Sequence, residues 1–368
     1  QSASRRYGAL RLSVRREMVM DDSFEWIRMR SADELRGRLH IAFQGEEGID
    51  AGGLTREWYS VLAKQIFNPG YCLFTPTSDG STFQPNPLSN INHQHLEYFK
   101  FVGRIVGKAI ADGQILDVHF TRSFYKHILG IPVVVDDMEA IDPEYYKNLK
   151  QILEYSLEDL GLELTFSTEF QLVEGMPPKY VDLVPNGQNV AVTDANKEEY
   201  VALITRERMT TSIREQIDAF LSGFHELIPA DLVSLFNENE LELLISGLPE
   251  IDLDDLRANT EYNSWRHSDK QIEWFWNALK SFNRQEKALF LQFVTGTSKV
   301  PLGGFAQLQG MRGIQRFSIH RACGPPEHLP SAHTCFNQLD LPEYTSEEQT
   351  REKLLTAIRE GSEGFGFG

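Results

Sequence analysis

Three cysteines are the candidate nucleophiles of this 368-residue chain, and their neighbours set them apart. A cysteine attacks as its thiolate, so a reactive one needs an accessible position and a neighbour that favours the charged form. Cys72, in NPGYCLF, lies among aromatic and apolar residues and is expected to pack as a small hydrophobe. Cys323 lies in the loop sequence HRACGPPEH, where an exposed bystander is expected. The spacing contains no CxxC pair and does not indicate zinc.

Cys335 has different surroundings, in the segment LPSAHTCFNQLDLP at residues 329–342. Prolines at both ends predict a short extended segment. Alternate side chains of an extended segment share a face, so His333 and Cys335 would point the same way with Thr334 between them. An imidazole or hydroxyl beside the sulfur could favour the thiolate. On these residues alone, a merely packed histidine is the commoner arrangement, and the usual partners of a papain-like protease are missing.

The rest of the chain must position this segment, and its first predicted element is a helix from Arg5 to about Leu35. Apolar residues at spacings of three and four form a stripe, which indicates this helix. The stripe consists of Tyr7, Leu10, Val14 and Met18. A glycine-rich turn at 45–54 lacks the GKS or GKT of a phosphate loop and leads into a predicted helix at 55–68. A longer helix is predicted from about His95 to Ile110.

Between about Gly130 and Glu207, short strand-like runs alternate with two helices, which indicates a small mixed subdomain inserted in a helical one. The predicted strands are IPVVV at 131–135, LELTF at 162–166, YVDLV at 180–184 and NVAVT at 189–193. Asp142 followed by Pro143 predicts the start of the first helix. The second helix is predicted from about Lys197.

Helical sequence resumes at 214–229 and at 237–247, where Gly247 is placed to end a helix. The polar stretch ANTEYNSWRHSDK at 258–270 has no apolar periodicity and predicts a linker. About a hundred residues follow, enough for a separate domain. They contain predicted helices at 272–280 and 285–293, the strand-like RFSIH at 316–320, and a last helix with Ser346 and Gln349 in capping-box spacing.

Five ordered motifs resemble the catalytic domain of HECT-type ubiquitin ligases. They are ELELLISG at 240–247, IEWFW at 272–276, FVTGTSKVPLGGF at 293–305, LPSAHTCFNQLDLP at 329–342 and the terminal EGFGFG. The sequences FNQLDLP, SKVPL and SEGFG are most similar to those of the giant Mule-type ligases, which carry this domain at their C-terminal end. Residue 1 is Gln rather than Met, so we expect the chain to be a piece of a longer protein.

The resemblance implies an α+β, bilobed fold. The N-lobe, residues 1–262, would be mostly helical and would contain the small mixed subdomain, at about 130–207, as the docking site for an E2 enzyme. A hinge at 263–266 would let the smaller α/β C-lobe, residues 267–368, swing between partners. We expect movement to centre on the residues from Tyr262 to Arg266.

The resemblance also assigns roles to particular residues. Cys335, flanked by His333 and Thr334, would accept ubiquitin from an E2 as a thioester and pass it to a substrate lysine. Thioester exchange is nearly isoenergetic, so alignment of two sulfurs matters more than a strong base. Phe365 matches the aromatic residue, fourth from the end, that anchors the tail during lysine transfer. The final Phe367–Gly368 departs from the family's common Leu–Ala ending.

Two binding surfaces follow from the same resemblance. The E2 groove would be formed by Leu149, Ile152, Tyr200 and Ile204, with Tyr145 and Leu162 as further candidates. On sequence alone these positions are two amphipathic helix faces, and a place in the core is an equal alternative. A second ubiquitin-binding site, or exosite, on the N-lobe would include Tyr71.

The net charge of −17 argues against nucleic acid as a partner and is concentrated in one part of the chain. Residues 1–20 hold five arginines and one glutamate, and residues 266–368 hold twelve basic and eleven acidic groups, which leaves −22 for residues 21–265. Residues 136–174 hold eleven acidic residues against two lysines. An acidic surface there could steer a basic E2.

The sequence also argues against other classes of protein. No apolar run approaches the roughly 18 residues of a membrane helix, so we expect a soluble chain in the cytoplasm or nucleus that does not bind membranes. No cofactor or metal is expected, because ATP is consumed upstream by E1. Substrates would be recruited mainly by regions outside this chain.

Two alternatives remain open on the sequence. A cysteine hydrolase of the deubiquitinase type would use the same nucleophile, but it needs an activating His with Asp or Asn and an oxyanion hole. A non-catalytic scaffold that binds E2 or ubiquitin would tolerate loss of Cys335.

Overall fold

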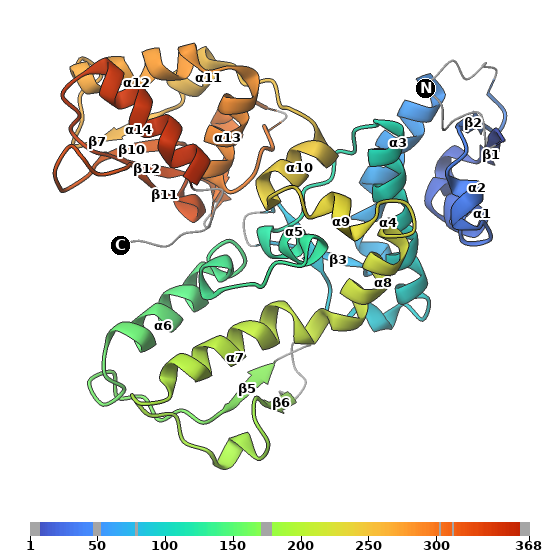
Figure 1. Cartoon of the computed structure of the whole chain (residues 1–368), viewed down its shortest axis with the longest axis horizontal. Helices are drawn as coiled ribbons and strands as arrows, with labels where there is room; N and C mark the ends of the chain where they lie inside the picture. Colours follow the sequence, from blue (N-terminus) through green and yellow to red (C-terminus); the bar gives the residue numbers. More distant parts are fainter. Residues whose placement is uncertain are drawn as a thin grey trace.

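The computed structural model describes residues 8–46, 53–77, 80–170, 179–301, 303–310 and 313–360, with the backbone alone at Phe170, Lys179 and Cys335. The fold is α+β, as predicted. Its buried apolar residues form three separate clusters, each within its own part of the chain. Figure 1 shows the corresponding three bodies. Across the described ranges, each helix is too short or too polar to cross a lipid bilayer.

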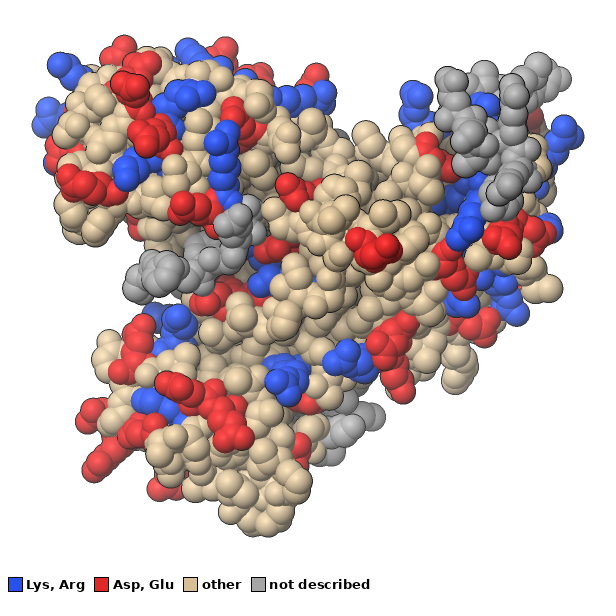
Figure 2. Space-filling model, viewed as in Figure 1, with Lys and Arg blue, Asp and Glu red and all other residues tan. Residues whose placement is uncertain are grey.

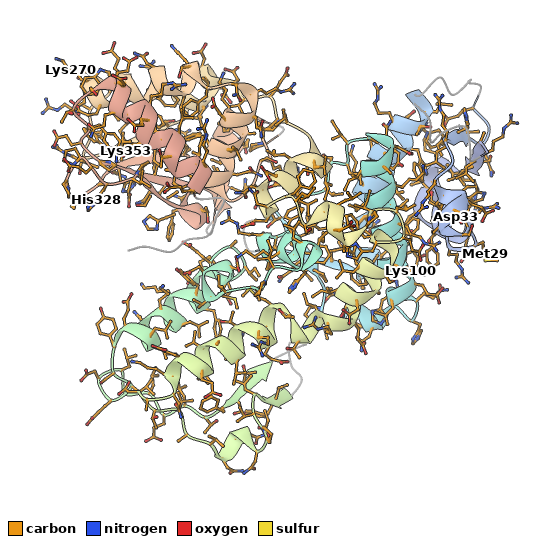
Figure 3. The ribbon with its side chains drawn as sticks, viewed as in Figure 1. Met29, Asp33, Lys100, Lys270, His328 and Lys353 are labelled. Carbon is orange, nitrogen blue, oxygen red and sulfur yellow. The ribbon has the colours of Figure 1, made fainter. Side chains whose placement is uncertain are left out.

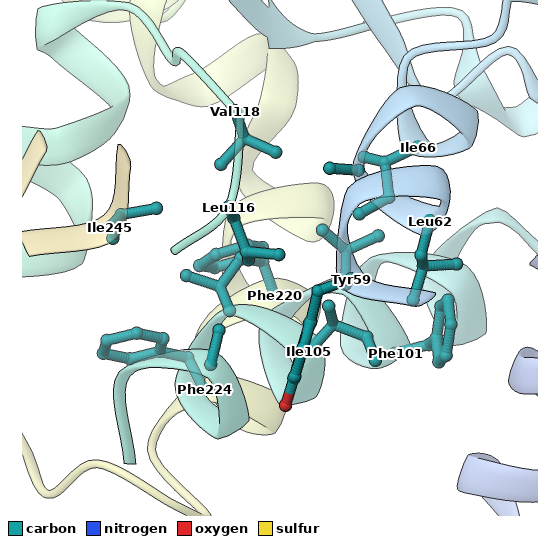
Figure 4. Packing of buried hydrophobic residues seen from close by; sticks show 14 of the residues in the cluster. Tyr59, Leu62, Ile66, Phe101, Ile105, Leu116, Val118, Phe220, Phe224 and Ile245 are labelled. Atoms are coloured by element: carbon teal, nitrogen blue, oxygen red, sulfur yellow. The ribbon is translucent and has the colours of Figure 1, made fainter. Parts of the chain in front are cut away.

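The largest cluster defines the N-terminal unit, which contains residues from Leu12 to Ile245. Two of its helices, α4 (His95–Asp112) and α8 (Arg214–Phe224), pack so closely that glycine is required on each. A Cβ added to Gly103 would lie 2.0 Å from the carbonyl oxygen of Phe220, and one added to Gly223 would lie 2.0 Å from that of Lys100. Aromatic and aliphatic side chains fill the space around this contact (Figure 4).

The other elements of this unit surround the helix pair. They are β1 (Leu10–Val14), α1 (Val19–Arg28), α2 (Ala32–Leu35), β2 (Leu39–Phe43), α3 (Gly53–Ile66), β3 (Phe74–Pro76), β4 (Phe83–Pro85), α5 (Arg122–Leu129), α9 (Ala230–Val233) and α10 (Glu238–Ser246). β1 and β2 form a parallel pair, and β3 and β4 form an antiparallel one.

The second cluster defines the small subdomain, built from α6 (Pro143–Glu154), β5 (Ser167–Phe170), β6 (Lys179–Asp182) and α7 (Lys197–Met209). Both helices begin where the sequence predicts. Asp142 caps α6, since its Oδ1 accepts a hydrogen bond of 2.9 Å from the backbone N–H of Tyr145. The apolar faces of α6 and α7 meet in this core.

The third cluster defines the C-terminal unit. Its elements are α11 (Leu253–Ala258), β7 (Glu261–Asn263), α12 (Lys270–Ser281), α13 (Arg284–Thr295), β8 (Gln309–Gly310), β9 (Gly313–Ile314), β10 (Ser318–Arg321), β11 (Ser331–His333), β12 (Gln338–Leu341) and α14 (Glu347–Glu360). Four strands form one sheet in the order β11-β12-β10-β7. β12 and β7 run parallel to β10, while β11 runs antiparallel to β12.

The predicted helix from Arg5 to Leu35 is wrong over its described first half. Leu10–Val14 is the strand β1, whose register pairs Leu10 with Leu39. Leu12 and Val14 are buried while Arg11 is exposed, which is the period of two expected of a strand. The helix α1 begins only at Val19.

Three of the four strands predicted in the small subdomain are also wrong. Only YVDLV overlaps a strand, β6, whereas NVAVT contributes a single bridge from Ala191 to Thr165 in LELTF. IPVVV leads instead into the 3-10 helix η4 (Val135–Met138). The Oδ2 of Asp137 accepts a hydrogen bond of 2.8 Å from the N–H of Val134, so this acidic residue caps a turn.

The predicted linker at 258–270, with its hinge at 263–266, is corrected by the structure. Tyr262 and Asn263 belong to β7, paired with Ile319 and His320 of β10, and Trp265 is only 7% exposed. Leu256 of α11 is buried in the same C-terminal core. A single strand in a mostly polar stretch leaves no apolar periodicity to detect. The residues that connect the N-terminal and C-terminal cores are 247–252, between α10 and α11.

Candidate active site

The backbone at Cys335 is a single 3-10 turn, η8 (Thr334–Phe336), between β11 and β12. The extended segment therefore ends at His333, and the expected alternation that would place His333 and Cys335 on one face does not apply. The residue after the turn, Asn337, has a left-handed φ of 49°. The local conformation of this segment depends on the two strands that flank it, which the sequence motif does not reveal.

Asn337 is the residue that fixes this turn, and sequence reasoning missed it. Its buried side-chain Nδ2 donates hydrogen bonds of 2.8 Å to the carbonyl oxygens of Gln309 and Gln315. Its own carbonyl accepts from the N–H of Ser318 at 3.0 Å. Asn tolerates the left-handed region better than most residues, which was the available signal.

His333 is exposed at the end of β11 and is held by Asp340 of β12. Its Nε2 lies 3.1 Å from the Oδ2 of Asp340, and Gln338 Nε2 donates to the other carboxylate oxygen at 2.7 Å. The antiparallel register pairs His333 with Gln338 and Ser331 with Asp340, which brings the two side chains together. A carboxylate bound to one ring nitrogen fixes the orientation of the imidazole.

Thr334 packs against the loop that follows α13. Gly296, which ends that helix with a φ of 79°, faces the Thr334 side chain, and a Cβ built on it would lie 3.5 Å from Thr334 Cβ. The hydroxyl of Thr295 donates to the carbonyl of Thr297 at 2.8 Å, which closes this loop on itself. The loop at 295–298 is therefore in contact with the turn that carries Cys335.

The loop before β11 is anchored to the helix α14 and the segment preceding it. The hydroxyl of Tyr344 donates to the carbonyl of His328 at 2.9 Å, and Lys353 Nζ donates to the carbonyl of Glu327 at 2.7 Å (Figure 3). Cys323 lies near the start of this loop and is exposed, as expected. Cys72 is half-buried. Phe365 and Phe367–Gly368 lie outside the described residues.

Most of the predicted groove positions of the small subdomain lie together. Leu149, Ile152 and Tyr200 are at most 6% exposed, yet they line a groove of about 380 Å³. Tyr145 and Leu162 line the same groove, and Leu162 is 40% exposed. Burial raises the pKa of Tyr200 to about 12, so its hydroxyl is neutral near pH 7.

Ile204 does not belong to that lining. It is 2% exposed and lies in the core between α6 and α7. Ile204 is therefore a core residue, while Leu149, Ile152 and Tyr200 are core residues that also line the groove. Acidic side chains lie over much of the small subdomain in the view of Figure 2, and Glu154, Glu158, Asp159 and Glu163 are exposed.

Tyr71 lies in the N-terminal unit, at the end of the 3-10 helix η2 (Pro69–Tyr71), and is half-buried. Its ring centroid is 5.5 Å from that of Tyr98, and its carbonyl accepts from Asn92 Nδ2 at 3.1 Å. Burial and the nearby carboxylate of Asp21 raise the pKa of Tyr71 to about 12. The fold thus fixes its backbone and leaves part of the ring accessible.

The sequence as a whole matches one family of proteins. The model of the HECT-domain (ubiquitin-transferase) family matches residues 60–368. The E3 ubiquitin-protein ligase UPL1 of Arabidopsis thaliana is 60% identical over 365 residues, which are 98% of this chain and 10% of that protein. HUWE1 of Mus musculus is 56% identical over 355 residues, 96% of this chain and 8% of that protein.

A third relative, the E3 ubiquitin-protein ligase TOM1 of Saccharomyces cerevisiae, is 52% identical over 360 residues, which are 97% of this chain and 11% of that protein. The chain thus spans 8% to 11% of the length of these curated relatives. The family model and the relatives agree with the five motifs, with one another and with the α+β fold. The chain belongs to the HECT-domain (ubiquitin-transferase) family.

Proposed function

We propose that this chain is the catalytic domain of an E3 ubiquitin ligase, in which Cys335 accepts ubiquitin from an E2 as a thioester and passes it to a substrate lysine. The observation that carries the proposal is the family motif around Cys335 in a chain that is 52% to 60% identical to three E3 ligases. The turn η8, fixed by Asn337, supports it by holding this cysteine in a short loop between two strands.

The reaction has two balanced steps. The Cys335 thiolate attacks the thioester carbonyl of the E2-bound ubiquitin, a new C–S bond forms, and the E2 cysteine leaves as a thiolate. A lysine amine then attacks the same carbonyl, an isopeptide bond forms, the amine loses a proton, and the Cys335 thiolate is released. We assign His333 and Thr334 to the immediate surroundings of that thiolate, with Asp340 fixing the ring of His333.

The E2 would dock on the small subdomain, in the groove lined by Leu149, Ile152 and Tyr200, with Tyr145 and Leu162 as further contacts. Ile204 would support this surface from the core. The local excess of acidic residues supports a partner with a basic surface. Ubiquitin would also contact the region of Tyr71, and Phe365 would anchor the C-terminal tail during lysine transfer.

The N-terminal unit and the C-terminal unit would correspond to the two lobes, with movement between them at residues 247–252. Gly247 has a φ of 79°, and a Cβ there would lie 2.8 Å from Ile115 Cδ1, so only glycine fits the start of this link. Arg284 Nη2 donates to the carbonyl of Leu248 at 2.9 Å. A few residues at the end of a helix are sufficient for a hinge.

Substrates would be selected mainly by regions outside this chain, because the relatives are about ten times as long. A cascade of thioesters needs reduced cysteines, which fits the cytoplasm or the nucleus. We expect no cofactor or metal in either step.

The test is to incubate the protein with E1, several E2 enzymes, ATP and ubiquitin, followed by a non-reducing gel. We expect a ubiquitin adduct that thiols remove and that Cys335→Ala abolishes. His333→Ala should form the adduct more slowly. A non-catalytic scaffold would give no adduct with any E2, and a deubiquitinase would cleave ubiquitin chains in the absence of E1 and E2; either result would replace the proposal.

A further inference from the structure

Glu242 of α10 is a buried carboxylate at the contact between the N-terminal unit and the C-terminal unit. It is 3% exposed, and four hydrogen bonds reach it from the C-terminal unit. Its Oε1 accepts from Thr297 Oγ1 at 2.8 Å, from the Ser298 N–H at 3.0 Å and from Ser298 Oγ at 3.1 Å. Its Oε2 accepts from Gln292 Nε2 at 2.6 Å.

The N-terminal unit contributes one partner of its own, His119. Nδ1 of His119 lies 3.1 Å from Glu242 Oε1, and Nε2 lies 3.3 Å from Oδ1 of Asp117. Burial disfavours a charged ring, but the two carboxylates outweigh it and raise the pKa of His119 above its ordinary value. Burial likewise disfavours a charged Glu242, but His119 and the Ser298 N–H hold the pKa of Glu242 below its ordinary value.

The residues that bind Glu242 lie beside the turn that carries Cys335. Thr297 and Ser298 follow Gly296, and Gly296 faces the side chain of Thr334. A chain of contacts therefore runs from α10 of the N-terminal unit, through the loop at 295–298, to η8. We call Glu242, His119, Gln292, Thr297 and Ser298 the inter-unit anchor.

A polar anchor suits a contact that must form and separate. A buried charge is costly unless it is paired and hydrogen-bonded, so Glu242 favours only the arrangement in which all its donors are in place. When the units separate, water can bind the same donors and acceptors, and the net cost of separation stays modest. An apolar contact would instead expose surface that favours aggregation.

We propose that Glu242 is a positioning residue, which holds the C-terminal unit in the orientation where Cys335 accepts ubiquitin from the E2. The inference rests on the proposed function. In Figure 1, β11, which ends two residues before Cys335, lies on the side of the C-terminal unit that faces α6. Since α6 forms part of the E2 groove, the anchored orientation directs the catalytic turn toward the E2.

The experiment compares Glu242→Ala, Thr297→Val and their double variant with the wild-type protein. Loading by the E2 and single-round discharge to free lysine are measured separately. We expect loading to slow about tenfold in Glu242→Ala, because small misplacement of reacting groups is costly, while discharge changes less than about twofold. The double variant should be no slower than Glu242→Ala, because both substitutions break the same anchor.

Two measurements distinguish loss of the anchor from general damage to the fold. Hydrogen exchange at the Ser298 amide needs no ubiquitin and should quicken in Glu242→Ala, while α14 amides stay unchanged. Asp112→Ala, which removes the partner of buried Lys108 within the N-terminal unit, serves as the control for general damage. Unchanged Ser298 exchange, or equal slowing of both steps, would overturn the inference. A wild-type protein that never loads would instead refute the proposed function, and the exchange measurement would still decide the anchor.

Discussion

Asn337 stabilises the turn η8 through its backbone conformation and through two part-buried hydrogen bonds. Its φ of 49° is unfavourable for most residues, and its side chain satisfies the carbonyl oxygens of Gln309 and Gln315. Those two residues come from the segment between α13 and β10, so the side-chain amide of Asn337 joins the turn η8 to a distant loop. This support fixes the backbone of the turn in which Cys335 lies.

Asn337→Ala should destabilise the protein by about 2–4 kcal/mol, from backbone strain and the loss of two part-buried hydrogen bonds. Asn337→Gly is the matched control, because glycine accepts the left-handed conformation but also loses the hydrogen bonds. It should fall between wild type and Asn337→Ala in urea-induced unfolding. Equal stability of Asn337→Ala and wild type would show that the turn does not depend on this residue.

Predictions for single residues depend on signals that are local in the sequence. The motif predicts Cys335, His333 and Thr334 together because these residues are adjacent along the chain. Asp340 was missed because its contact with His333 depends on the register of β11 and β12. Glu242 was missed because it meets His119 across 123 residues, a pairing that no local pattern reveals.

Helices and strands were predicted correctly where local sequence signals determine them, and wrongly where long-range pairing does. The start of α6 was predictable because Asp142 and Pro143 are strong local signals, and the structure confirms it. β1 was taken for a helix because its stability comes from the parallel partner β2, which follows 25 residues later and is joined to it through α1 and α2. β7 was taken for a linker because its partner, β10, lies more than fifty residues away.

The groove between the helices of the small subdomain can be tested as the docking site of the E2. Leu162→Ser removes an exposed apolar contact without opening the core, and it should reduce E2-dependent loading about tenfold if the E2 docks there. Tyr155→Ser is the matched control, since Tyr155 is 54% exposed and lies outside the groove lining. Equal loading by the two variants, measured at limiting E2 concentration, would place the docking surface elsewhere.

The described residues form three cores, and under the proposed function two of them change their relative orientation during transfer. Glu250 lies in the link at 247–252 and is exposed. Glu250→Pro stiffens that link and should slow complete transfer from E2 to lysine several-fold. Ala230→Pro is the control, because residue 230 is the first of α9, where proline is tolerated. Transfer at the wild-type rate in Glu250→Pro would exclude the link as the hinge.

The uneven distribution of charge along the chain predicts how loading by the E2 depends on salt. Residues 21–265 carry a net charge of −22, whereas residues 266–368 are close to neutral. If this charge steers the E2, raising ionic strength from about 50 to 500 mM should slow loading, since screening shortens the reach of surface charges. Discharge to free lysine from the loaded protein should change much less. Loading that is independent of salt would contradict steering.

The most direct test of the proposed function is the intact mass of the protein after incubation with E1, E2, ATP and ubiquitin. Wild type should gain the mass of one ubiquitin, and thiol treatment should remove it. Cys335→Ser should gain the same mass through an ester that resists thiols, because oxygen replaces sulfur at the same position. A thiol-sensitive adduct on Cys335→Ala, or on a peptide that contains Cys323 or Cys72, would contradict the assignment of Cys335 as the nucleophile.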